Sequence, residues 1–463
     1  MENKTVQPPA SPVKKRALLI NRNFALLWNG GIVSRFGDFI FNVTLVLWIV
    51  ASLAANQIWA PLAVSGVLVA ATLPVLLLGP FAGVFVDRWK DKRGVMLRMD
   101  ALRALLVALL LPINYIATLP AMVQQHISTP LLLGSIYGVV FLTSVCAQFF
   151  IPASQVVFFD ILDEDDRTRA SGLFQMISSF ASILGPPLAS LLYFTVGVQW
   201  ALIINAASFL ISFLALKLMH LEVTQEQGEK RNSFMHEFKE GIRFYVKTPF
   251  LVIALITLLL TVLWDGAFSA LGVFFVSQNL QAPVSYYGFL GTAMGVGLTV
   301  GALSLGLVRR RIGELKVFCY SIILTGLLVI VYSRMTVFIP SLIVITLLGL
   351  LVAAVNVTFT PLLLEVTPRK LLGRVRSVVG PILNLSYTLS VSFVSWLDAT
   401  VLHRFQTVFL GIRFTSIDTI FSTAGVLCLL SGIYALIKLG GMSRAEAKEG
   451  TGEIPQEEAA VQS

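Results

Sequence analysis

The stretch from Phe250 to Val276 reads FLVIALITLLLTVLWDGAFSALGVFFV, and Asp265 is its only charged residue. The hydrocarbon core of a bilayer is about 30 Å thick, which an α-helix crosses with roughly 20 apolar residues. Backbone groups in lipid must find partners within a helix or a closed barrel, and barrel strands need only about 9–11 residues. This stretch is therefore predicted to form one membrane-spanning helix.

Further apolar runs of this kind occur along the whole chain, six before a polar linker and six after it. The composition agrees, because 56% of the 463 residues are hydrophobic and 13% are charged, against about 45–50% and about 25% in soluble domains. Such a chain would expose large apolar patches in water, which excludes a soluble enzyme and a nucleic-acid-binding domain. The predicted spans lie at about 24–50, 61–86, 95–118, 131–153, 170–194, 200–219, 250–276, 286–308, 315–333, 339–361, 376–398 and 414–438.

The basic residues are concentrated in alternate loops, which sets the expected orientation. The loop after the second span holds Arg88, Lys90, Lys92 and Arg93, and the loop after the eighth holds Arg309–Arg311. Lys and Arg are enriched in cytoplasmic loops. Both termini are therefore expected in the cytoplasm.

The predicted fold is an all-α integral membrane protein with twelve transmembrane helices in two pseudo-symmetric six-helix bundles. Asp38 lies fourteen residues after Phe24, and Asp265 lies fifteen residues after Phe250, so the two halves carry matching landmarks. In membrane proteins built from such repeats, the binding site lies between the halves. The predicted parts are a cytoplasmic tail (1–20), a first bundle (21–219), a cytoplasmic linker (220–248), a second bundle (249–439) and a cytoplasmic acidic tail (440–463).

The linker contains one stretch with helical spacing of apolar residues. Phe234, Phe238 and Tyr245 alternate there with charged side chains. This pattern favours a short amphipathic helix against the inner lipid headgroups. The alternative is a plain solvated linker.

The chain resembles transporters of the major facilitator superfamily over about residues 20–438. Within that superfamily it is most similar to bacterial macrolide-efflux proteins and enterobactin exporters. The resemblance implies a multi-pass protein of the bacterial cell membrane that works by alternating access. It rests on Asn21-Arg22-Asn23-Phe24, Gly37-Asp38, Gly83-Val-Phe-Val-Asp87-Arg88, Phe150-Ile-Pro152-Ala153, Arg169-Ala-Ser-Gly172 and Gly185-Pro186-Pro187.

Two segments resemble functional motifs of this family. Gly83, Asp87 and Arg88 match its loop signature, and the resemblance implies that Asp87 contacts the start of span 11 near Arg374 and locks an outward-facing state. The alternative is that these charges only anchor the loop on the inner side. The family's later basic pair is displaced here to Lys92-Arg93, which leaves the role of that pair open.

The second segment, Gly185-Pro186-Pro187, resembles the span-5 motif of the family's antiporters. Its small side chains let helices approach closely, and its prolines bend the span. The resemblance to antiporters favours export as the direction of transport. The alternative is an ordinary proline kink with tight packing.

Charged residues inside the spans are the candidate coupling groups, because burying them in lipid is costly. Asp38 and Asp265 lie roughly 21–23 Å from the inner ends of their helices at a rise of 1.5 Å per residue. Arg35 lies one turn below Asp38, so that an ion pair is available. We expect Asp38 and Asp265 to exchange protons, and Arg35 to take part by alternately breaking and restoring its contact with Asp38. The alternative is a permanent pair of Arg35 and Asp38 that holds the helix in place. Asp100 and Arg103 are expected to snorkel to the inner interface.

The expected function is secondary transport without catalysis. No Gly-Lys dipeptide and hence no phosphate loop occurs, and no metal-binding or nucleophile motif is present. We expect a monomer without cofactor, metal or nucleic-acid partner, which exports macrolide-like or other amphipathic compounds in exchange for protons. Asn42, Trp264 and Phe268 are the candidate cavity residues, although the aromatic rings could face lipid. The alternatives are a siderophore or metabolite exporter, or a lysophospholipid flippase without proton coupling.

Overall fold

The computed structural model describes residues 20–117, 129–220, 234–368, 371–403, 405–409 and 412–441. Within these residues the chain is helical apart from one short hairpin. The N-terminal half contains α1 (Arg22–Trp48), η1 (Ile49–Leu53), α2 (Ala60–Arg88), α3 (Lys92–Ala108), α4 (Leu110–Ala117), α6 (Thr129–Asp160), α7 (Glu164–Val196) and α8 (Val198–Leu218). After α9 (Phe234–Lys247), the C-terminal half contains α10 (Pro249–Gln278), η2 (Val284–Tyr286), α11 (Tyr287–Ile312), α12 (Glu314–Ser333), α13 (Phe338–Val366), α14 (Leu372–Trp396), η3 (Leu397–Val401), β1 (Gln406–Phe409), β2 (Ile412–Thr415) and α15 (Ser416–Gly440).

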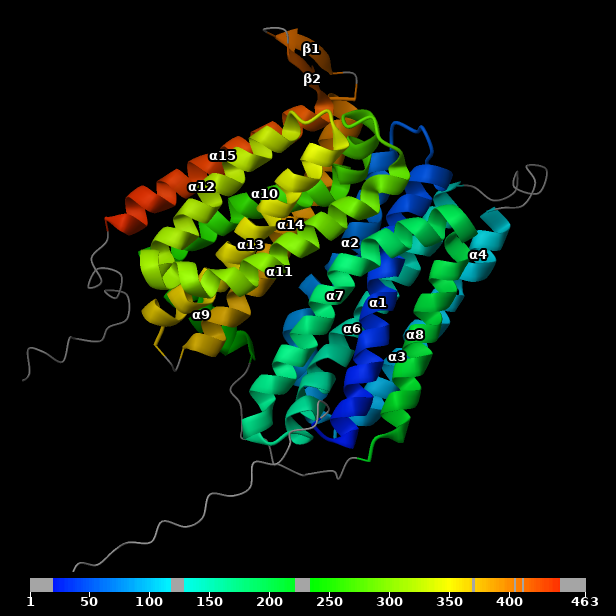
Figure 1. Ribbon diagram of the computed structural model, residues 1–463. Coiled ribbons are helices and arrows are strands. Elements are labelled where there is room, and N and C mark those ends of the chain that lie inside the picture. Colours follow the sequence, from blue (N-terminus) through cyan, green and yellow to red (C-terminus); the bar gives the residue numbers. More distant parts are fainter. Residues whose placement is uncertain are drawn as a thin grey trace, which may run out of the picture.

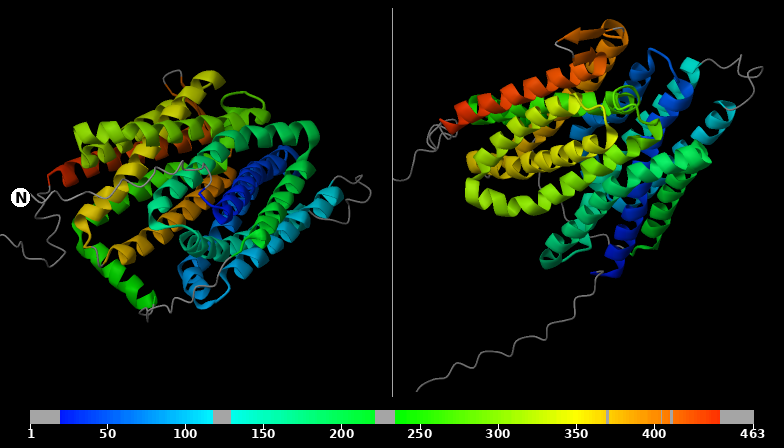
Figure 2. Two further views of the ribbon diagram at one scale, coloured as in Figure 1. Left: turned by 60° about the horizontal axis from the view of Figure 1, so that its bottom comes forward. Right: turned by 45° about the horizontal axis from the view of Figure 1, so that its top comes forward.

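The helices form two bundles that lie side by side (Figure 1). One bundle contains α1 to α8 and the other contains α10 to α15, and the two further views in Figure 2 show the same division. Among the described residues, eleven helices are long and apolar enough to cross a membrane. The chain is therefore a multi-pass membrane protein of two helical bundles.

The third predicted span forms two consecutive helices, α3 and α4, with a turn at Leu109 between them. Pro112 explains the interruption, because proline has no N–H to donate to the carbonyl four residues earlier and its ring clashes there. That carbonyl belongs to Ala108, the last residue of α3.

The two ends of the bundles differ in chemistry. At one end, here called the basic end, α2 finishes and α3 begins among Arg88, Lys90 and Lys92. At the other, the hairpin end, β1 and β2 pair antiparallel with Gln406 opposite Thr415. These two strands were not predicted from the sequence.

Arg334 secures the hairpin to the bundle. Its guanidinium lies 4.2 Å from the ring centre of Phe414 in β2 and 3.6 Å from an oxygen of Asp418 in α15. The same group donates to Ser422 Oγ at 2.6 Å. Asp418 also caps its own helix by accepting a hydrogen bond from the Thr415 N–H. The hairpin, α12 and α15 are therefore joined at one point.

The linker helix forms as α9 and packs on the C-terminal bundle; its position at the inner lipid headgroups stays a prediction. Phe244 and Tyr245 are buried in a cluster with residues of the C-terminal bundle. Glu240 forms an ion pair with Arg374 of α14. Helix α9 packs on α14 at Gly241, where only a hydrogen fits against the backbone carbonyl of Arg374. The side chains of Phe234 and Phe238 lie outside the described residues.

Glycines allow the closest helix crossings. A Cβ at Gly326 of α12 would lie 2.7 Å from the carbonyl oxygen of Gly425 in α15. Gly37 of α1 would place a Cβ 2.5 Å from Ser208 Oγ of α8. Small residues therefore hold these helix pairs together through direct backbone packing.

We predict that Gly326→Leu destabilises the protein by about 1–3 kcal/mol, since the side chain must displace α15. The measurement is the thermal transition of the detergent-purified protein. Gly134→Leu is the control, because nothing lies within 4 Å of a Cβ at that exposed glycine. Equal transition temperatures for the two variants would contradict the packing argument.

Candidate functional site

A polar stripe runs along α1 in the middle of an apolar span. Arg35, Asp38 and Asn42 are spaced by three and four residues, which places them on one helical face. Arg35 and Asn42 are exposed and Asp38 is half-buried. Polar groups at this depth in a membrane helix face protein or water, because exposure to lipid is too costly. This face of α1 is therefore a candidate lining of a transport path.

The predicted ion pair between Arg35 and Asp38 is not formed between these two described residues. The guanidinium groups of Arg103 in α3 and of Arg35 both act through space on the Asp38 carboxylate. The helical spacing makes the pair with Arg35 available, but the Arg35 side chain is exposed. Asp38 is thus influenced by a cation on another helix as well as by one on its own.

Arg103 lies inside the N-terminal bundle, where it is 6% exposed. Its guanidinium is 4.8 Å from the ring centre of Phe150 in α6 and 5.2 Å from that of Phe209 in α8. Aromatic faces attract a guanidinium, and more strongly when water is excluded. Its Nη1 lies 3.7 Å from Asp100 Oδ1, and Asp100 is 1% exposed.

The prediction that Asp100 and Arg103 snorkel to the interface is therefore wrong. Helix α3 packs against both α6 and α8, so this face of α3 points into the bundle and not toward the headgroups. Asp100 faces Ser212 of α8. A hydropathy pattern gives the depth of a residue but not which neighbouring helix covers it. The sequence therefore pointed to Asp100 and Arg103 but placed their side chains at the wrong surface of the helix.

Asp100 and Arg103 form a buried ion pair, and the half-buried Asp38 interacts with both through space; the three residues are called the triad below. Asp38 and Asp100 act on each other electrostatically, and Arg103 acts on both. Among the described residues, Asp100 Oδ2 and Arg103 Nε have no hydrogen-bond partner. One guanidinium cannot fully compensate two carboxylates away from water. The triad can therefore accept one proton without leaving a cation uncompensated.

Asp265 of α10 has a different environment in the C-terminal half. It is half-buried and faces Tyr387 of α14 and Cys428 of α15. Among the described residues, no Lys or Arg forms an ion pair with it. The next residue, Gly266, packs closely against Ser390 of α14. The two matching carboxylates thus differ in countercharge.

The structure separates the candidate cavity residues. Trp264 is 1% exposed, and its ring centre lies 5.1 Å from that of Phe421 and 5.8 Å from that of Tyr332. It lies inside the C-terminal bundle, and it packs against Phe268 at 5.4 Å. Phe268 is half-buried and Asn42 is exposed. Trp264 therefore packs against the Phe268 ring from the interior of the bundle and does not itself line a surface in this conformation.

The motif at Gly185-Pro186-Pro187 lies where the two halves meet. A Cβ at Gly185 would lie 2.5 Å from Phe39 Cβ of α1, so this glycine packs within its own half. Pro186 packs on α11, because a Cβ at Gly291 would lie 2.8 Å from its ring. Pro187 is half-buried.

Hydrogen bonds join the halves beside these small residues. Gly288 N–H of α11 donates to Ser190 Oγ of α7 at 3.1 Å, and Thr292 Oγ1 donates to the carbonyl of Ile183 at 2.9 Å. On the second pair of helices, the hydroxyls of Thr72 in α2 and Thr388 in α14 are 2.9 Å apart. All of these contacts lie in the half of the helices that is nearer the hairpin end, where the two bundles come together in Figure 1.

Residues 27–390 match the sequence profile of the Major Facilitator Superfamily. The chain belongs to this family. The fold agrees, since the nucleoside transporter NupG superposes with a TM-score of 0.70 at 13% identity, covering 90% of this chain and 99% of NupG. A bacterial homologue of the iron transporter ferroportin superposes with a TM-score of 0.67 at 15% identity, covering 91% and 99%.

Several sequence relatives are also Major Facilitator proteins. The MFS-type transporter YkuC of Bacillus subtilis is 23% identical, covering 95% of this chain and 97% of YkuC. Macrolide efflux protein A of Streptococcus pyogenes is 21% identical, covering 78% and 86%. The enterobactin exporter EntS of Escherichia coli is 24% identical, covering 64% and 67%. The resemblance found in the sequence is therefore confirmed at the level of the family.

The displaced basic pair of this Major Facilitator protein binds helix ends. Lys92 Nζ donates to the carbonyl oxygens of Asp87 at 2.9 Å and Trp89 at 2.6 Å, at the end of α2. Arg93 donates to the carbonyls of Leu216 at 2.8 Å and Lys217 at 2.6 Å, at the end of α8. Cations are favourable at helix C-termini, where carbonyl groups lack partners. This pair therefore stabilises the ends of two helices at the basic end.

The other residues of the loop signature lie nearby. Gly83 is half-buried with open space beside its Cα, and Arg88 is exposed. Arg374, the predicted partner of Asp87, forms an ion pair with Glu240 of α9. The contact of Asp87 with the start of α14 stays a prediction.

We predict that Arg103→Gln lowers stability by about 3–5 kcal/mol, because it leaves Asp100 buried without its cation. Adding Asp100→Asn should restore part of the loss. The measurement is a double-mutant cycle on the thermal transition in detergent, with exposed Arg22→Gln as the control. Strictly additive effects of the two substitutions would show that the pair contributes nothing.

Proposed function

We propose that the protein is a secondary active exporter of amphipathic compounds, with its basic end in the cytoplasm. The observation that carries this proposal is the contact between α7 and α11 at Pro186, Gly288 and Gly291. Together with the Thr72–Thr388 contact, it joins the halves in the part of the helices nearer the hairpin end. Two bundles held at one end can rock about it, which is the motion that alternating access needs.

The chemistry of this contact suits a gate that opens and closes. It consists of small residues and few hydrogen bonds between neutral groups, each worth about 0.5–1.5 kcal/mol net. No ion pair among the described residues crosses it. The free energy of separating the halves there can therefore be supplied by substrate binding or by protonation elsewhere.

We assign proton coupling to the triad, with Asp38 as the group that exchanges the proton. Asp38 is half-buried, on the same face as the exposed Arg35 and Asn42, while Asp100 is enclosed. When Asp38 is protonated, Arg103 is held by Asp100 alone; when it is charged, the two carboxylates share Arg103. A conformational change that opens or closes access to Asp38 then moves a proton across the membrane. One charge moved through 100 mV supplies about 2.3 kcal/mol.

Substrate recognition is assigned to α1 and α10. Asn42 supplies a polar contact, Phe268 an aromatic face, and Asp265 a carboxylate without a fixed cation. A mixture of this kind suits bulky compounds with apolar bodies and a polar or basic group. The relatives macrolide efflux protein A and the multidrug efflux pump Tap of Mycolicibacterium fortuitum support such substrates.

A siderophore exporter is the second candidate, and its support is the similarity to EntS. The two functions differ in phenotype. Deleting the gene should raise macrolide accumulation in the first case, whereas in the second it should impair growth only when iron is limiting.

We predict that Asp38→Asn abolishes transport driven by a pH gradient, with at least a tenfold loss, but retains exchange of substrate across the membrane. The measurement is efflux and counterflow of a radiolabelled macrolide in proteoliposomes with an imposed pH gradient. Asp165→Asn, at an exposed position in the first turn of α7, is the control. Unchanged gradient-driven transport by Asp38→Asn would refute its role in coupling.

We also predict that Gly291→Leu shifts the protein toward a conformation open at the hairpin end, because its side chain cannot fit against Pro186. The measurement is the spin-label distance between exposed positions Val196 and Tyr286, which flank the contact. The distance distribution should move to longer values, whereas Gly134→Leu should leave it unchanged. An unaltered distribution for Gly291→Leu would mean that this contact does not close the path.

A further inference from the structure

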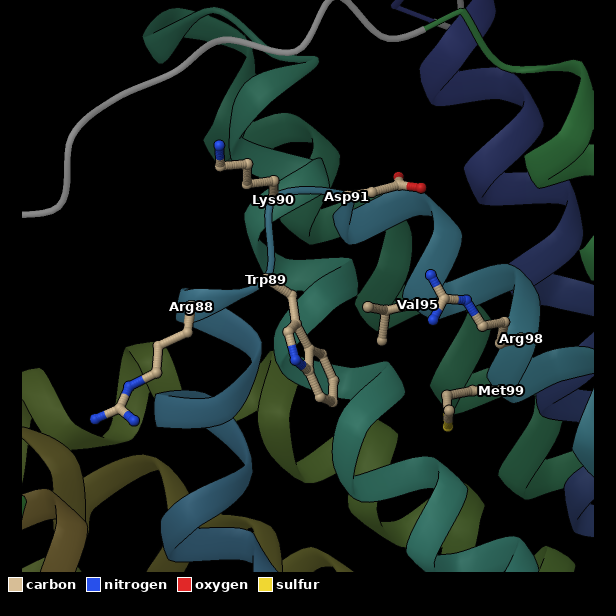
Figure 3. A pocket seen from close by; sticks show the side chains of 7 residues that line it. All are labelled: Arg88, Trp89, Lys90, Asp91, Val95, Arg98 and Met99. Carbon is tan, nitrogen blue, oxygen red and sulfur yellow. The ribbon is translucent and has the colours of Figure 1, made fainter.

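A hollow of about 300 Å³ lies at the basic end of the N-terminal half, where α2 turns into α3 (Figure 3). Its lining includes the basic residues Arg88, Lys90 and Arg98, together with Trp89 and Met99. None of these residues belongs to the triad or to the contact between the halves. The hollow is therefore separate from the proposed transport path.

The basic residues of this region fall into two groups. Lys92 and Arg93 are engaged with carbonyl groups at the ends of α2 and α8. Arg88, Lys90 and Arg98 are exposed, and none of them forms an ion pair or hydrogen bond with another described residue. Only this second group lines the hollow, so its cations are available to a ligand.

One carboxylate shares the hollow, but it is already engaged. Asp91 accepts a hydrogen bond from the Gly94 N–H at 2.7 Å and caps the start of α3. It compensates the N-terminal end of the helix dipole. Three cations and one carboxylate leave the lining with a net positive charge, which favours an anionic ligand.

Trp89 fixes the depth of the hollow in the membrane. Its indole is exposed, packs 5.7 Å from the ring of Phe149 in α6, and lies between the side chains of Arg88 and Arg98 (Figure 3). Tryptophan is enriched at the level of the lipid headgroups. The cations around it are therefore placed at headgroup level.

An exposed apolar stripe leads away from Arg98 along α3. Leu102, Leu105 and Leu109 follow it at spacings of four, seven and eleven residues, which is one helical face, and all three are exposed. Exposed leucines on a membrane helix contact acyl chains. A ligand with an acidic head and apolar chains would satisfy the hollow and the stripe together.

We propose that this hollow binds the phosphate of an anionic phospholipid from the inner leaflet, with its acyl chains along the leucines of α3. Guanidinium groups bind phosphate oxygens through paired, charge-assisted hydrogen bonds. Basic pockets on the cytoplasmic side of membrane proteins bind such headgroups. A phosphatidylcholine headgroup is disfavoured because its quaternary ammonium would enter a hollow whose lining carries a net positive charge.

The test uses quenching of Trp89 fluorescence by brominated lipids. The full-length protein is placed in phosphatidylcholine nanodiscs that contain increasing fractions of brominated phosphatidylglycerol or brominated phosphatidylcholine. The Trp89 signal is the difference between the wild type and Trp89→Phe. We expect half-maximal quenching at a mole fraction at least fivefold lower for phosphatidylglycerol than for phosphatidylcholine.

The triple variant Arg88→Gln/Lys90→Gln/Arg98→Gln should lose this preference. The matched control is Arg22→Gln/Arg311→Gln/Lys316→Gln, which removes the same charge from other exposed positions and should keep it. Equal quenching by the two lipids in the wild type, or loss of the preference in the control variant, would overturn the proposal.

Inorganic phosphate separates the lipid from a soluble anion. Millimolar sodium phosphate, compared with sodium chloride at equal ionic strength, should not displace phosphatidylglycerol. Displacement would show that the hollow binds a free phosphate and would overturn the lipid assignment. Because binding is read without transport, the result is independent of the proposed export function.

Discussion

The placement of one guanidinium between two aromatic rings determines how charge is arranged inside the N-terminal half. Arg103 lies between Phe150 and Phe209, out of reach of bulk water. A buried cation must be compensated by groups that the protein itself supplies. Asp100 is held beside it on the same helix, and its charge also acts through space on Asp38 of α1. The proposed coupling group therefore owes its environment to α3, a helix that does not take part in the described hydrogen bonds between the halves.

The two halves share a fold but differ in the charged and aromatic residues that they contain. The N-terminal half carries the compensated charges and the basic hollow, while the C-terminal half carries a carboxylate without a paired cation and a dense aromatic cluster around Trp264. They meet through glycine, proline and hydroxyl groups of α7, α11, α2 and α14. The described hydrogen bonds between the halves join neutral groups, so each half can keep its own electrostatic balance while the halves move.

Of the twelve spans predicted from hydropathy, the described residues show eleven, because lipid imposes length and apolarity on each one, whereas the third is interrupted between α3 and α4. The family followed from short motifs, and the profile match confirms it. The sequence could not reveal that Arg103 and Asp100 point inward, since this depends on α6 and α8 packing over them. It suggested Arg35 as the partner of Asp38 because helical spacing is visible in a sequence, whereas contacts between helices are not. For the same reason the sequence did not reveal that α9 packs on α14: an amphipathic face fits lipid or protein equally well.

The bonds of Lys92 and Arg93 have a mechanical consequence. Through these bonds, the α2–α3 turn is hydrogen-bonded to the C-terminal carbonyl groups of α2 and of α8, two helices that are far apart in the chain. Neither helix can slide along its axis without breaking several charge-assisted bonds. The N-terminal half is thereby stiffened against internal shear at its base, and any large movement there must take the form of a whole-body rotation.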